Sequence, residues 1–271
     1  MKYIGILLGI LFLFALFFPR RVPRLLRRTG RVAGDVGRAG QEFVTGVEVR
    51  GSPLARYEVR AGKIVALRIL TLNALSPDVT LQARVRDIGG RLAAHAQRHE
   101  IPYQFSVLES GEPNAFAVPG GSIFITRRLL DLCDDRGDCV AGVLGHEVIH
   151  VDRFHAIRTL AATTAVRTGF HVLSLGRAAI LSRIAGGMED LLVKGYRQDQ
   201  ELEADIFGVR IARLAGFDPL GFVELLRRLR EVQPEAGGRL EAILGYFRTH
   251  PSLDVRIENL RKEIARLGTR P

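Results

Sequence analysis

The spacing of apolar residues along the chain predicts several amphipathic helices. One such stripe recurs at intervals of four and three residues, which is one face of a helix: Leu81, Val85, Ile88 and Leu92. Asp218 followed by Pro219 is typical of a helix start, because Asp caps the first turn and Pro is tolerated within it. Further helices are expected from near Asp138 and over the ranges 197–215, 219–233 and 252–267.

Short apolar segments in the first half of the chain predict β-strands at 103–108, 114–118 and 122–126. A Pro-Gly-Gly turn at 119–121 separates the last two segments, so they are expected to form a hairpin. Thr126 is placed to cap a short helix that follows the last strand. We expect these helices and strands to form one domain spanning 76–267, of the α+β class.

The N-terminus carries an uncharged, apolar run from Tyr3 to Phe18, preceded by Lys2. This run is slightly short for a straight bilayer span of about 20 residues and long for a cleavable signal core of roughly 7–15. No A-x-A cleavage pattern follows it. We therefore expect residues 1–19 to be an uncleaved signal anchor, with an ordinary cleaved signal as the alternative. Residues 20–75, rich in Pro and Gly, are expected to be a basic juxtamembrane and connecting region with a few strands or turns.

The net charge of +10, from 39 Lys and Arg against 29 Asp and Glu, raises the question of nucleic-acid binding. Six of those ten surplus charges come from arginines that directly follow the apolar run: Arg20, Arg21, Arg24, Arg27, Arg28 and Arg31. No basic run is interleaved with aromatic residues, so contact with an anionic membrane surface explains the charge better than nucleic acid does. Membrane sidedness is ambiguous, because these arginines favour a cytoplasmic flank whereas exported anchored enzymes have the opposite orientation.

Two cysteines flank an acidic loop before the helix that begins near Asp138. With two Cys in 271 residues, neither a disulfide scaffold nor a Cys-built zinc module is possible. In an oxidising compartment Cys133 and Cys139 could form a disulfide across the loop, and in the cytoplasm they would be two small buried thiols. The disulfide is the favoured interpretation.

The candidate chemistry lies in residues 146–150, which read HEVIH. On a helix His146 and His150 are one turn apart and face the same way, so both imidazoles can bind one metal ion. Glu147 is then placed to act on water rather than to bind the metal. Zinc suits nitrogen and oxygen ligands with one open position. The alternative is a surface helix with two unrelated histidines, but apolar neighbours such as Val143 and Leu144 favour a buried catalytic helix.

A third ligand is available in the segment 197–208. On a helix Glu201 and Asp205 share a face with Gly208 and Ala212, and these small residues would let that face approach another helix closely. We take Glu201 as the third ligand and expect Asp205 to accept the outer N–H of a ligand histidine. Glu203 points elsewhere on such a helix and is expected to be a solvated acidic group.

Four motifs in this order resemble the M48 metallopeptidases: NAFA with PGG at 114–121, VLGHExxHV at 143–151, ExEAD at 201–205, and His250-Pro251 with Arg256-Ile257. The resemblance implies a mainly helical, zincin-like domain with a small β-sheet and one Zn²⁺ per chain. It places the metal ligands on His146, His150 and Glu201, and the general base on Glu147. With a single apolar run, the chain looks most like the singly anchored or periplasmic quality-control branch. It departs from the family where Tyr196 stands in place of a Ser before Arg197.

The resemblance implies a membrane-anchored zinc endopeptidase that acts on misfolded or membrane-associated proteins, on the periplasmic or extracytoplasmic side. A latent, chaperone-like member that binds clients and cleaves rarely is the first alternative. A basic membrane-surface adaptor with a vestigial site is the second. An edge strand in the hairpin at 114–126 could bind an extended peptide through its backbone.

The other histidines are expected to have different roles. His250 could donate to the oxyanion or cap the zinc in a resting state, or it could be a structural residue at a helix start. His95 and His99 extend the helix stripe near its end and are expected to be bystanders, as is His155, which lies off the ligand face of its helix. The apolar, Arg-dotted stretch 157–187 is expected to be either a core helix pair or a lid over the cleft.

Overall fold

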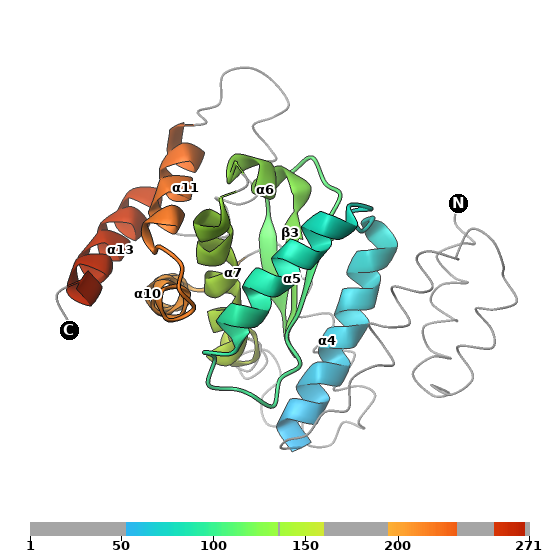
Figure 1. The fold of residues 1–271 in the computed structure, drawn as a ribbon. Helices are drawn as coiled ribbons and strands as arrows, with labels where there is room; N and C mark the ends of the chain where they lie inside the picture. Colours follow the sequence, from blue (N-terminus) through green and yellow to red (C-terminus); the bar gives the residue numbers. More distant parts are fainter. Residues whose placement is uncertain (1–52, 135, 160–194, 232–251, 269–271) are drawn as a thin grey trace, which may run out of the picture. The chain divides into compact units, whose positions relative to one another are not determined.

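The computed structural model describes residues 53–134, 136–159, 195–231 and 252–268 (Figure 1). The expected anchor at 1–19, most of the stretch 157–187, and His250 lie outside these residues. Within the described ranges, no helix is both long and apolar enough to span a bilayer. The described part is mainly helical with a small sheet, as expected.

The sheet has three strands, β1 (Gln104–Leu108), β2 (Ala115–Val118) and β3 (Ser122–Thr126), in the order β1-β3-β2. β2 pairs antiparallel with β3, which confirms the expected hairpin, and β1 pairs parallel with β3. The hairpin turn requires glycine, because Gly120 and Gly121 have φ angles of 81° and 96°. β3 is buried along its whole length, as expected of a central strand, and β2 lies at an edge of this sheet.

Helix α4 (Pro53–Leu72) corrects the expectation of strands or turns before residue 75. Its buried residues recur at helical spacing, from Ala55 through Val59 and Ala66 to Ile69. The Gly and β-branched residues of this segment obscure the period in the sequence. The helix passes close to the hairpin turn, since a Cβ at Gly62 would lie 1.6 Å from the carbonyl oxygen of Pro119.

Helix α5 (Val79–Ala93) begins at Asp78, whose side chain accepts a hydrogen bond of 2.9 Å from the backbone N–H of Leu81. Its expected stripe faces the core, with three of the four residues buried: Val85, Ile88 and Leu92. Thr126 caps the short helix α6 (Arg127–Leu132) through the N–H of Leu129, as expected.

The disulfide between Cys133 and Cys139 spans the loop from α6 to the next helix, α7 (Gly137–Asp152), which confirms the favoured interpretation of these cysteines. Every residue from Cys139 to Asp152 is buried, because α7 has α5, β2, α10 (Gln198–Leu214) and α11 (Leu220–Glu231) packed around it. Helix α13 (Leu253–Gly268) packs on α10 and α11 (Figure 1).

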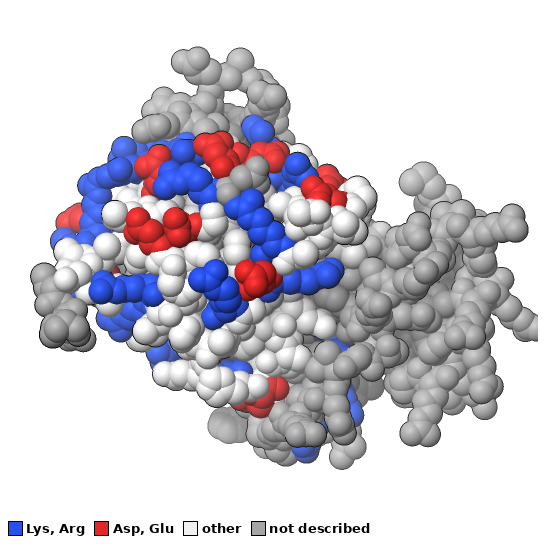
Figure 2. Space-filling model, in the orientation of Figure 1, with Lys and Arg blue, Asp and Glu red and all other residues white. Residues whose placement is uncertain are grey.

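The surface of this helical body carries mixed charge. On the face in Figure 2, acidic side chains lie among basic ones rather than apart from them. The ion pairs at the surface of the described residues include Arg127 with Asp131 and Arg230 with Asp254. Such pairs contribute little to stability, so the fold depends on its buried contacts.

One close contact of backbone with backbone joins α7 and α10. A Cβ at Gly145 would lie 2.8 Å from the carbonyl oxygen of Gly208, and a Cβ at Gly208 would lie 2.9 Å from the backbone nitrogen of His146. Because backbone atoms are met on both sides, no side-chain rotation can relieve either contact. The expectation that a small-residue face of α10 approaches another helix is confirmed.

Gly208→Ala should therefore force α10 away from α7. We expect the free energy of unfolding to fall by about 1–3 kcal/mol, the usual cost of overpacking. Urea denaturation followed by circular dichroism measures the change. Gly90→Ala is the matched control, because a Cβ at Gly90 meets nothing within 4 Å. There the higher helix propensity of Ala should raise the free energy of unfolding by about 0.5–1 kcal/mol. Equal effects of the two substitutions would contradict the close approach.

Candidate metal centre

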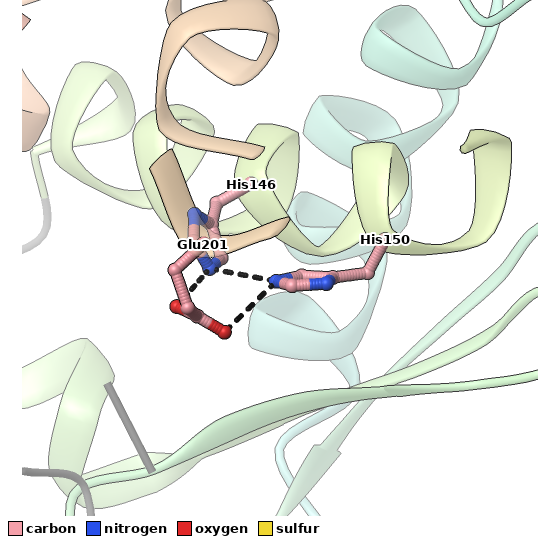
Figure 3. Close-up of side chains that lie close together, drawn as sticks. All are labelled: His146, His150 and Glu201. Atoms are coloured by element: carbon pink, nitrogen blue, oxygen red, sulfur yellow. Dashed lines mark hydrogen bonds and ion pairs between the residues drawn. The ribbon is translucent and has the colours of Figure 1, made fainter. Parts of the chain in front are cut away.

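Two helices bring three ligand-type side chains together. His146 and His150 project from the same face of α7, and Glu201 projects toward them from the first turn of α10 (Figure 3). All three are buried, with at most 2% of each side chain exposed. The convergence expected from the sequence is therefore present in the fold.

The distances in this cluster fit a tetrahedral metal ion. The two Nε2 atoms of His146 and His150 are 3.0 Å apart, and they lie 3.4 and 3.5 Å from the two carboxylate oxygens of Glu201. Ligands at about 2.0–2.1 Å from a tetrahedral zinc are about 3.3 Å from one another. Among the described residues, His146, His150 and Glu201 form the one group of three or more His, Cys, Asp or Glu side chains whose ligand atoms are close enough to bind a single metal ion.

His146 is held by a buried chain of charged groups. Its Nδ1 lies 2.9 Å from Oδ1 of Asp205, and Asp205 forms two hydrogen bonds, of 2.7 and 2.8 Å, with the guanidinium of Arg256 on α13. Asp205 and Arg256 are both completely buried. With Oδ1 of Asp205 beside its Nδ1, the ring of His146 turns Nε2 toward the metal position, in keeping with the place expected of Asp205.

The charges around His146 also set the protonation of the metal-free site. Burial by itself disfavours the cation, but the hydrogen bonds and charges of Asp205 and Glu201 raise the pKa of His146 to about 9. Burial likewise opposes the carboxylate of Asp205, but Arg256 and His146 hold its pKa below the ordinary value. The site is thus built to stabilise positive charge at the point where the imidazole Nε2 atoms and Glu201 meet.

Glu147 is buried beside the first ligand, at the edge of the sheet. Burial raises its pKa to about 7, while a hydrogen bond from the backbone N–H of Ala117 in β2 opposes that rise. A carboxyl group with a pKa near neutrality can both accept and return a proton. Helix α7 packs on β2, so the edge strand lies next to the helix that carries this carboxyl group.

His150 has partners that the sequence interpretation missed. Its Nδ1 lies 2.9 Å from Nδ1 of His155, and Nε2 of His155 lies 3.3 Å from a carboxylate oxygen of Glu203. The ring of Tyr196 stacks on that of His150 at 3.8 Å between centroids. The expectations that His155 is a bystander and that Glu203 is merely solvated were wrong.

The reason for the error lies at the end of α7. A continuous helix would direct a side chain five residues beyond His150 away from the ligand face. Instead α7 ends at Asp152, and Phe154 takes the left-handed conformation with φ of 57°. This residue interrupts the helix, and Nδ1 of His155 comes within 2.9 Å of Nδ1 of His150. His95 and His99, by contrast, lie in the loop beyond α5 and are exposed, so they do not extend its stripe.

The profile of peptidase family M48 matches residues 80–264, which include every helix and strand that forms the cluster. The chain belongs to peptidase family M48. Enzymes of this family depend on zinc, and the His-His-Glu cluster supplies the donor atoms that zinc prefers.

Relatives of this M48 chain include bacterial proteases and a mitochondrial metalloendopeptidase. It is 28% identical over 226 residues to the β-barrel assembly-enhancing protease of Yersinia pestis, covering 79% of this chain and 45% of that one. It is 28% identical to the mitochondrial metalloendopeptidase OMA1 of Schizosaccharomyces pombe, covering 64% and 50%. For the metalloprotease YcaL of Escherichia coli the identity is 29%, covering 60% and 63%. The M48 chain thus spans about half the length of these curated relatives.

Arg256→Met should leave the buried carboxylate of Asp205 without its guanidinium. Removing one partner of a buried ion pair costs about 3–5 kcal/mol, so the free energy of unfolding should fall by that order, as measured by urea denaturation of the metal-free protein. Lys262→Met on the same helix is the control, because Lys262 pairs with Glu258 at the surface and its loss should not measurably change stability. A similar loss in both variants would argue against the chain from Arg256 to His146.

Proposed function

We propose that this chain is a zinc-dependent endopeptidase, with one Zn²⁺ held by His146, His150 and Glu201. The convergence of these three buried side chains at 3.0–3.5 Å, with Glu147 beside them, carries the proposal. The names of the relatives, each a protease, support it. An adaptor with a vestigial site is disfavoured, because both the donor set and the buried groups that orient His146 are intact.

Each residue has a distinct task in this mechanism. When bound, zinc supplies a Lewis acid that polarises the scissile carbonyl group and acidifies water. Glu147 takes a proton from the attacking water and returns it to the nitrogen of the leaving amine. Asp205 and Arg256 favour a proton on Nδ1 of His146 and keep its Nε2 turned toward the metal position, so on metal binding the ring loses the Nε2 proton without having to turn.

We further propose that the substrate backbone binds along β2. This strand has a neighbour on one side in the described sheet, and the N–H of Ala117 is directed toward Glu147. A peptide added to that edge would pass directly over the general base, and main-chain hydrogen bonds would make binding tolerant of sequence. Broad tolerance suits a protease of misfolded proteins.

We propose that the enzyme is anchored in a membrane by residues 1–19, with its catalytic domain on the extracytoplasmic side. The uncharged run from Tyr3 to Phe18 supports the anchor, and the disulfide between Cys133 and Cys139 supports an oxidising compartment. Misfolded or membrane-associated proteins are then the substrates within reach, in keeping with relatives named for β-barrel assembly.

A latent protease that holds clients and cleaves rarely is the second candidate. Burial of the site favours it, since His146, Glu147, His150 and Glu201 are each at most 3% exposed. A polypeptide substrate cannot reach the ligands in this conformation without movement of neighbouring groups. The two candidates share one metal site and differ in the rate of cleavage.

Glu147→Gln should strongly slow casein cleavage while zinc remains bound. Loss of a general base typically costs 10²–10⁴-fold, so kcat should fall by about that factor. Cleavage is followed with fluorescent casein and the zinc content by elemental analysis of the full-length protein. Glu109→Gln, at an exposed position beyond β1, is the control and should retain wild-type activity.

The outcome separates the candidates. One zinc per chain with casein cleavage that requires Glu147 supports the endopeptidase, whereas one zinc per chain with slow cleavage and tight casein binding supports the latent form. Wild-type protein that holds no zinc would contradict both.

We also propose that His250 donates a hydrogen bond to the developing oxyanion. His250→Ala should then lower kcat more than it raises KM, because the contact forms in the transition state. Steady-state kinetics on a fluorogenic peptide measure both constants. Activity equal to wild type would leave His250 as a structural residue at a helix start.

A further inference from the structure

We propose that His155 and Glu203 form a positioning relay that orients His150 for metal binding. The inference rests on the proposed zinc site and deepens it. Its structural basis is a chain of two contacts behind the second ligand: 2.9 Å from Nδ1 of His150 to Nδ1 of His155, and 3.3 Å from Nε2 of His155 to Oε2 of Glu203. His155 is completely buried within this chain.

The hydrogen-bond pattern of the relay admits one arrangement of protons when a metal is bound. His150 must offer the lone pair of Nε2 to the metal, so its Nδ1 carries the proton and donates to Nδ1 of His155. His155 must then be neutral, with its own proton on Nε2, and it donates that proton to the carboxylate of Glu203. In the other direction, the carboxylate of Glu203 favours a proton on Nε2 of His155, which leaves Nδ1 of His155 free to accept a hydrogen bond from His150. Glu203 thereby favours the metal-binding tautomer of a ligand that it does not touch.

The backbone that places His155 is itself held firmly. Arg98 donates a hydrogen bond of 2.9 Å to the carbonyl oxygen of Val151 in the last turn of α7, and its guanidinium lies 3.7 Å above the ring of Phe154. Arg98 in turn forms a buried ion pair of 2.6 Å with Glu58 of α4. The left-handed turn at Phe154 is thus clamped, and His155 is directed toward His150 by the fold.

The two ligand histidines are therefore oriented in different ways. Nδ1 of His146 lies directly against the carboxylate of Asp205. Nδ1 of His150 instead contacts the ring of His155, and His155 contacts the carboxylate of Glu203. The outer carboxylate, Glu203, is 29% exposed and lies within 3.8 Å of the arginines at 153 and 158. The stacked ring of Tyr196 restrains the plane of His150, and the relay restrains its rotation within that plane.

The test measures zinc affinity in the full-length protein by competition with a chromogenic chelator at fixed pH. His155→Leu keeps the volume but removes the acceptor, and zinc should bind about 10–100-fold more weakly, as on loss of a group that orients a ligand. His155→Asn loses volume but offers a side-chain carbonyl oxygen near the position of Nδ1, and it should bind zinc more tightly than the Leu variant. A role in packing alone predicts the reverse order.

A second pair of variants applies the test at the surface. Glu203→Leu should weaken zinc binding, and Glu224→Leu should leave it unchanged. Glu224 is a close match, because it is 38% exposed and also lies near two arginines, Arg227 and Arg228. The visible spectrum of the Co²⁺-substituted protein provides a further readout, which should change in His155→Leu and Glu203→Leu but not in Glu224→Leu. These surface variants keep the test decisive if His155→Leu does not fold.

The results distinguish failure of the relay from failure of the proposed function. Tight zinc binding in the wild type with unchanged affinity in His155→Leu and Glu203→Leu would overturn the relay and leave the zinc site standing. Weaker binding in His155→Asn than in His155→Leu would also overturn it. Wild-type protein without zinc would overturn both the relay and the proposed function.

Discussion

The close approach of α7 and α10 at Gly145 and Gly208 is the constraint on which the site depends. Two ligands come from α7 and the third from α10, so the distance between the helix axes determines whether the three can share an ion. Each glycine Cα lies where any side chain would collide with backbone of the other helix. The same contact brings the polar face of α10, with Glu201 and Asp205, onto His146.

This proximity requires burial of charged groups, which would be unfavourable if they were not compensated. Arg256 on α13 neutralises Asp205, and Asp205 in turn stabilises the proton on His146, so three helices contribute to one buried chain of ion pairs. The metal position completes this arrangement, because a divalent cation would offset the carboxylate of Glu201. Stability and metal binding are therefore coupled through the same side chains.

Helix α4 and the loop that follows α5 stabilise the C-terminal end of α7. The ion pair of Glu58 with Arg98, and the contacts of Arg98 with Val151 and Phe154, terminate α7 where the chain must turn. Glu58 also accepts a hydrogen bond from the N–H of Gly120 in the hairpin turn. One buried carboxylate thus connects α4, the edge hairpin and the end of the catalytic helix.

Local pattern in the sequence was sufficient for the strands, the hairpin, most helices, the HEVIH segment, and the face of α10 that carries Glu201 and Asp205. These features depend on residues within a few positions of one another, whose periodicity and turn chemistry are legible along the chain. Helix α4 was missed because its Gly and β-branched residues mask its period. The roles of His155 and Glu203 depend on a left-handed residue at Phe154 and on contacts of Arg98 with groups up to 56 positions away in sequence. No local pattern encodes such a turn, because long-range packing decides it.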